Sequence, residues 1–170
     1  MAETVAESAR APLAGVRRVF ATIAVTVAAA VAGGLLGAHA ASAPAQQAAA
    51  YLAIAQAGNA RLERDFDRLH GADRHDPVQA DADLRDIAAT EHLFDRRLST
   101  LALPPGPRSW AHTLIIVNEA RAALTTRAAA SRSPAQLATW QTRLTTANIP
   151  VEQAVRAIRS ELGLPPPETD

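Results

Sequence analysis

The sequence predicts an all-α protein, an up-down-up-down four-helix bundle preceded by an N-terminal signal or anchor helix. Three observations support this class. Residues 46–163 contain four stretches in which apolar residues recur every three or four positions, the spacing of the buried face of a helix. Glycine, proline or a capping residue bounds each stretch. Before them, the segment 19–37 is uncharged and follows two arginines, Arg17 and Arg18.

The uncharged segment 19–37 predicts that the rest of the chain is exported. Its 19 residues are about long enough to cross a hydrocarbon layer of roughly 30 Å, and basic residues on the cytoplasmic side set the orientation. Ala38-His39-Ala40 follows, a pattern after which signal peptidase cleaves. Two outcomes stay open: residues 1–40 are a cleaved signal peptide and the protein is secreted, or they anchor it in the cell membrane. Residues 41–45 then form a short linker.

Composition limits the chemistry and the partners that we expect. Removing 40 of the 170 residues leaves 130, which is the size of one domain. Seventeen basic residues balance 17 acidic ones, and this neutrality argues against a nucleic-acid partner. The absence of cysteine excludes disulfides and thiolate metal sites. We therefore expect no nucleic acid, cofactor or metal, and as partners the membrane, through residues 19–37 if they are uncleaved, and a protein.

Sequence signals mark the ends of the first two helices. The first is expected from about Gln46 to His70, followed by Gly71 as a left-handed cap. Asp76 is an N-cap for the second helix, which ends before the proline-rich turn 103–107. Aspartates and arginines crowd the corner between these helices. We expect a solvated corner of mixed charge, because the D-x-D-x-D-G pattern of a calcium loop is missing.

The third helix is expected to start between residues 107 and 109 and to bury Trp110 in its apolar stripe. The fourth begins after Ser133, an N-cap followed by proline at the first helical position. Helices of about 25 residues are roughly 37 Å long, and the short connections make consecutive helices antiparallel.

The fourth helix contains a proline and has a clear end. Pro150 removes one backbone hydrogen bond and predicts a kink or a break near residues 148–150. Gly163 is expected to end the helix as a left-handed cap. Residues 164–170 then form a proline-rich acidic tail.

Each apolar stripe is interrupted near its middle by a polar residue. Counting from the turns places these residues within about one helical turn of the same level. A buried polar group without a partner costs on the order of 1–3 kcal/mol, so we expect them to bond one another or to surround a water or a ligand. This layer is the candidate ligand-binding site, and its members are Asn59, Glu91, either Asn118 or Arg121, and Asn148.

Three interpretations of the layer stay open. It could fix the register of the helices, as a buried asparagine does in coiled coils, or it could form a small polar pocket opened by the Pro150 kink. An enzyme with Glu91 as a base is the third. A di-metal carboxylate site is disfavoured, because the Glu-x-x-His pairs of such bundles are absent. No residue is assigned a catalytic role.

Two strings carry a resemblance to known proteins. Tyr51-Leu52-Ala53 with Asn59, together with the ending AIRSELGLPP at residues 157–166, is similar to small exported helical proteins of actinobacteria that have no known function. The resemblance implies the same bundle and supplies no activity. We therefore expect a non-catalytic exported protein that acts as a structural or protein-interaction module at the cell envelope. The alternative is a bundle that binds a small ligand in the polar layer.

Overall fold

The computed structural model describes residues 42–73 and 76–167, and within these ranges all regular structure is helical. Four helices follow one another: α2 (Ala43–His70), α3 (Pro77–Ser99), α4 (Pro105–Ala129) and α5 (Pro134–Glu161). The four-helix bundle predicted from the apolar periodicity is therefore confirmed. The predicted signal or anchor segment and the end of the acidic tail lie outside the described residues.

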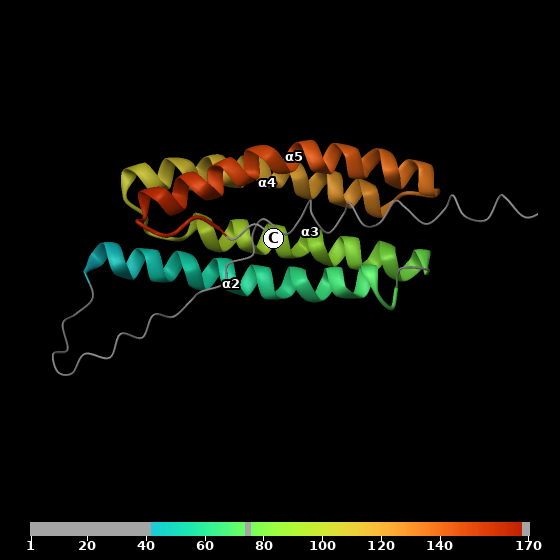
Figure 1. The fold of residues 1–170 in the computed structure, drawn as a ribbon, viewed down its shortest axis with the longest axis horizontal. Helices are drawn as coiled ribbons and strands as arrows, with labels where there is room; N and C mark the ends of the chain where they lie inside the picture. The colour runs from blue at the N-terminus through green and yellow to red at the C-terminus, as the bar shows by residue number, and fades with distance from the viewer. Residues whose placement is uncertain (1–41, 74–75, 168–170) are drawn as a thin grey trace, which may run out of the picture.

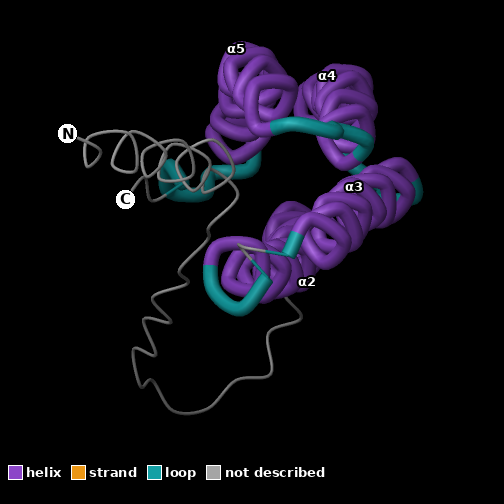
Figure 2. Tube along the Cα trace, turned by 90° about the vertical axis from the view of Figure 1, so that its right-hand side faces the viewer, coloured by secondary structure: helices purple, strands orange, loops and turns teal. Residues whose placement is uncertain are grey.

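Consecutive helices run antiparallel, as the short connections require (Figure 1). Seen nearly end-on, α4 and α5 lie side by side, α3 lies next to α4, and α2 lies next to α3 (Figure 2). Side chains join the first helix to the last, because Tyr51 and Ala55 of α2 belong to the same apolar cluster as Val151 and Ile158 of α5. One end of the bundle holds the start of α2 and the α3–α4 turn, and the other holds the α2–α3 and α4–α5 turns.

Several helix ends follow the sequence signals. The Asp76 carboxylate accepts hydrogen bonds from the backbone N–H groups of Val78 and Gln79, at 2.9 and 3.2 Å, and so caps α3. Ser133 caps α5 by accepting from the Gln136 N–H at 3.3 Å. Gly163 has φ +66°, and the N–H of Leu164 reaches back to the Arg159 carbonyl at 2.8 Å, which completes a left-handed cap.

Two local predictions were wrong, and of the kink or break predicted at Pro150 only the break is excluded. Gly71 has φ −102°, so it is not a left-handed cap; a Cβ there would lie 2.6 Å from the Asp67 carbonyl oxygen, and this contact is what favours glycine. Helix α5 continues through Pro150 without a break and curves over the bundle (Figure 1). Trp110 is 41% exposed, because the buried face of α4 follows Pro107, Ala111 and Leu114 and leaves Trp110 at its edge.

The buried apolar residues form two clusters along the bundle. The cluster at the α2–α3 turn end includes Leu62, Phe66, Ile87 and Leu144. The cluster toward the α3–α4 turn end consists of Tyr51, Ala55, Phe94, Leu98, Leu103, Ala111, Leu114, Val151, Ala154, Val155 and Ile158. The polar residues predicted at mid-height come between these two groups in each helix. Apolar packing thus supports the layer from both sides.

The described helices do not include a membrane span: none of them is both long enough and apolar enough to cross a bilayer. The segment 19–37, for which a membrane role is predicted, lies outside the described residues.

Candidate functional site

All five predicted layer residues are buried. Their exposed fractions are 6% for Asn59, 1% for Glu91, 1% for Asn118, 0% for Arg121 and 3% for Asn148. Glu91 thus faces the interior, and both alternatives on α4, Asn118 and Arg121, belong to the layer. Their spacing of three residues explains this, since it keeps both on one face of the helix.

Arg121 is the centre of the layer and links three helices. Its Nη2 lies 3.0 Å from Glu91 Oε1 on α3 and donates to Asn118 Oδ1 at 2.7 Å within α4. Its Nη1 donates to Asn148 Oδ1 on α5, also at 2.7 Å. The guanidinium has donors in a fixed plane, so these three acceptors set its orientation. A sliding of α3 or α5 along α4 would break these bonds.

The layer extends beyond the predicted residues through two carboxyl groups. Asn118 Nδ2 donates to Asp95 Oδ2 at 2.9 Å, and Asn148 Nδ2 donates to Glu152 Oε1 at 2.7 Å. Asp95 and Glu152 each follow a layer residue by four positions, one helical turn, and this spacing is the signal by which the sequence could have revealed them.

One acid near the surface acts on the buried Asp95. The Glu119 carboxylate is near enough to Asp95 to raise its pKa. Glu119 Oε1 in turn lies 2.9 Å from the Nδ1 atom of the half-buried His92. The Glu119–His92 pair on the solvent side of α3 and α4 therefore influences the titration of the buried Asp95.

Burial shifts the titration of the two acids on α3. The pKa of Glu91 is raised, because the loss of hydration outweighs the attraction of Arg121. Burial also raises the pKa of Asp95, to about 7; the hydrogen bond from Asn118 opposes this shift, and the nearby carboxylates of Glu119 and Glu91 add to it. Asp95 is thus the layer acid that changes its protonation near neutral pH.

Asn59 is buried but does not join the network. Both atoms of its side-chain amide are enclosed and lack a hydrogen-bond partner in the described structure. The expectation that every layer residue bonds another is therefore wrong for α2. The Arg121 guanidinium already has acceptors on α3, α4 and α5, and none of these contacts reaches α2.

The charged corner between α2 and α3 is less solvated than expected. Asp65 and Asp83 are each 3% exposed, and Arg68 bridges them, with Nη2 2.9 Å from Asp65 and Nε 2.8 Å from Asp83. Thr90 Oγ1 lies 3.5 Å from the second Asp65 oxygen. Burial raises the pKa of Asp65, and Arg68 opposes the shift. Arg68 also lies 3.2 Å from the exposed Asp86, so this corner joins two buried aspartates to the surface through one partly exposed arginine.

The layer has little room for an added group. Two cavities of the described structure are a space of about 20 Å³ between α2 and α3, at Gly58 and Phe94, and one of about 410 Å³ between α4 and α5. No layer residue lines either of them. Within the described ranges, the structure has no group of three or more histidine and carboxylate side chains placed to hold a metal ion.

Comparison with known proteins adds no relative: the chain matches no family model, no curated protein and no solved structure. The arguments about function therefore rest on the chain's own residues.

Proposed function

We propose that this protein is a non-catalytic, exported helical bundle that acts as a structural or protein-interaction module at the cell envelope. In this proposal residues 1–40 direct export, either as a cleaved signal or as a retained anchor, and the bundle stands outside the cytoplasm. A kinship with the small exported helical proteins of actinobacteria belongs to the same proposal.

The observation that carries the proposal is how the buried polar groups are used. The Arg121 guanidinium contacts Glu91, Asn118 and Asn148. The two asparagines in turn donate to the carboxyl groups of Asp95 and Glu152. Such a layer fixes the relative positions of helices, as buried polar residues do in coiled coils. A catalytic acid or base needs an approach for substrate, whereas the Glu91 side chain is fully enclosed.

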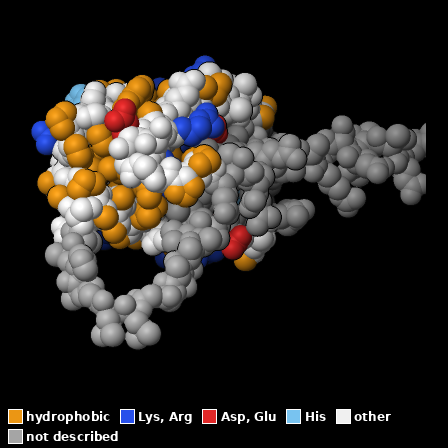
Figure 3. Space-filling view, turned by 60° about the vertical axis from the view of Figure 1, so that its left-hand side comes forward, with side chains coloured by type: hydrophobic (Ala, Val, Ile, Leu, Met, Phe, Trp, Pro, Cys, Tyr) orange, Lys and Arg blue, Asp and Glu red, His pale blue; other side chains and the backbone are white. Residues whose placement is uncertain are grey.

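An apolar end of the bundle supports an interaction role. Figure 3 shows hydrophobic side chains gathered at the end where α2 begins and α3 turns into α4. Exposed residues of this end include Ala102, Pro105, Trp110 and Pro165. Contiguous apolar surface of this kind is typical of contacts with proteins or membranes. Helix α2, which begins at this end, follows in the sequence the segment 19–37 that is proposed to enter the membrane.

Native mass spectrometry of the protein purified from its own host, from both membrane and culture fluid, tests the export and the absence of a resident ligand. We expect either a chain that starts at Ala41 in the fluid or the full chain in the membrane, without added mass. Full-length protein confined to the cytoplasm would contradict export. A stoichiometric added mass that the Asn59→Leu substitution abolishes would contradict the structural role of the polar layer.

A photo-crosslinking residue tests the interaction surface. Placed at Trp110, it is expected to trap a defined partner protein in the host. Val78 is a matched control, because it is also apolar and exposed, at 73%, but lies at the opposite end of the bundle. Equal crosslinking from both positions would contradict an interaction surface at the Trp110 end.

The second candidate is a bundle that binds a small ligand in the polar layer, and Asn59 is the observation that favours it. A buried amide without a partner is unfavourable by about 1–3 kcal/mol, and a bound polar molecule would satisfy it. This candidate predicts that Asn59→Leu abolishes uptake of a ligand that copurifies with the parent protein.

A further inference from the structure

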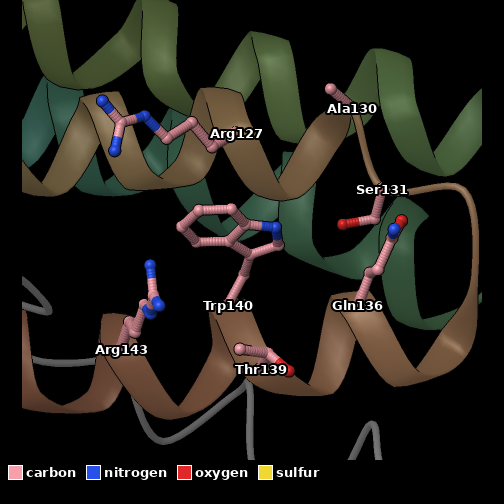
Figure 4. A pocket seen from close by; sticks show the side chains of 7 residues that line it. All are labelled: Arg127, Ala130, Ser131, Gln136, Thr139, Trp140 and Arg143. Atoms are coloured by element: carbon pink, nitrogen blue, oxygen red, sulfur yellow. The ribbon is translucent and has the colours of Figure 1, made fainter.

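A cavity of about 410 Å³ lies between α4 and α5 at the end of the bundle where these two helices turn. Figure 4 shows the Trp140 indole in the middle of the cavity, with the Arg127 and Arg143 side chains on either side of it. Ser131 and Gln136 lie at the other side of the cavity, toward the turn. Ala130 and Thr139 complete the lining. This cavity is separate from the polar layer.

The two arginines of this cavity lack acidic partners. Four of the described arginines pair with carboxylates: Arg68, Arg85, Arg121 and Arg156. Among the described residues, neither Arg127 nor Arg143 forms an ion pair. The sequence explains this, because the stretch from Glu119 to Glu152 contains four arginines and no acidic residue between its two ends. Like charges on one small surface repel each other, and an anion between them would relieve this repulsion.

The other lining groups favour a ligand that also has an apolar part. The Arg143 guanidinium carbon lies 4.8 Å from the centre of the Trp140 ring, an arrangement that holds the arginine beside the indole. Trp140 packs on the apolar cluster beneath and remains partly accessible. Ser131 Oγ is enclosed at the edge of the cavity and has no hydrogen-bond partner in the described structure. Ligand sites commonly combine an apolar wall with a few polar groups in this way.

We propose that the α4–α5 cavity binds a small amphiphilic anion, with its carboxylate or phosphate group held by Arg127 and Arg143 and its apolar part against Trp140. Guanidinium groups suit such oxygens, since their N–H donors match the geometry of both groups. This site does not depend on the structural role proposed for the polar layer, and the two can be tested separately.

Fluorescence of Trp140 provides the test. The chain has two tryptophans, so Trp110→Phe in the full-length protein leaves Trp140 as the reporter. Benzoate and phenyl phosphate are the probes, and benzamide, an uncharged molecule close to benzoate in shape, is the control for charge. We expect a saturable change of fluorescence with both anions and none with benzamide. Arg127→Gln and Arg143→Gln are each expected to weaken binding roughly tenfold or more.

A matched variant and three outcomes make the test decisive. Arg96→Gln removes an exposed arginine of α3, far from the cavity along the fold, and is expected to leave binding unchanged. Equal affinity for benzoate and benzamide would overturn the proposal, and this comparison needs no variant at either arginine. Unchanged affinity in both Arg127→Gln and Arg143→Gln would also overturn it. A response to phosphatidylglycerol vesicles, without one to the soluble anions, would contradict a small-molecule site.

Discussion

Replacing Asp95 with asparagine is expected to remove a large pH dependence of stability. The Asp95 side chain is buried and its pKa is raised from 3.8 to about 7 in the folded protein. An acid with a raised folded pKa binds its proton more tightly in the native state than in the unfolded chain. Its contribution to stability is therefore fully present below about pH 4 and is lost as the pH rises to about 7.

The magnitude follows from the difference of about 3 pH units between the two pKa values. Each unit corresponds to about 1.4 kcal/mol, so ionisation of Asp95 destabilises the fold by about 4 kcal/mol at pH 8. Asparagine is uncharged and keeps an oxygen that can accept the hydrogen bond from Asn118. Asp95→Asn is therefore expected to match the parent at pH 4 and to exceed its free energy of unfolding by about 4 kcal/mol at pH 8.

Urea unfolding followed by circular dichroism at pH 4, 5.5, 7 and 8 measures this difference. Comparing the two proteins at each pH cancels the titration of all other groups that behave alike in both. Glu63→Gln is the matched control, because Glu63 is an exposed acid of α2. A difference between Asp95→Asn and the parent that is constant across this range would refute the reasoning, as would a less stable variant at pH 8.

The remaining predictions concern single side chains of the layer and one helix end. Arg121→Met leaves the buried Glu91 carboxylate uncompensated and is expected to lower the free energy of unfolding by about 3–5 kcal/mol. Adding Glu91→Met to this variant is expected to restore part of the loss. If denaturant unfolding shows that the effects of the two substitutions simply add, the two residues are not coupled. Asn59→Leu is expected to raise the melting temperature, because it removes an unsatisfied buried amide, and a lower melting temperature would instead favour a register-fixing role for Asn59. Gly163→Ala is expected to cost about 1 kcal/mol in thermal unfolding, since φ is +66° there, and an unchanged stability would show that the cap is not needed.

The level of the polar layer could be predicted from the sequence because helix geometry is regular. Each residue rises about 1.5 Å, so counting from the turns places Glu91, Asn118 and Asn148 at about one height. The same counting could not decide which polar atoms would meet. Arg121 is long enough to reach across to α3 and α5, and its reach determines the network more than the level of its Cα does.

Other features could not be predicted, because they depend on how far each helix is rotated about its axis. Trp110 lies toward solvent, although it is next to the buried Ala111, because the buried face of α4 continues through Leu114 and Asn118. The burial of Asp65 and Asp83 depends on Arg68, whose side chain spans two helices. Asn59 lacks a partner because the contacts of Arg121 go to α3, α4 and α5, and none of them reaches α2. The α4–α5 cavity similarly depends on side-chain packing near the turn.

A high-resolution crystal structure of the protein isolated from its own host tests the central claim most directly. We expect Arg121 to contact Glu91, Asn118 and Asn148, and we expect only protein or water atoms within the polar layer. Electron density for a bound molecule beside Asn59, with Arg121 turned away from Asn148 to meet it, would contradict the claim that this layer serves the architecture of the bundle.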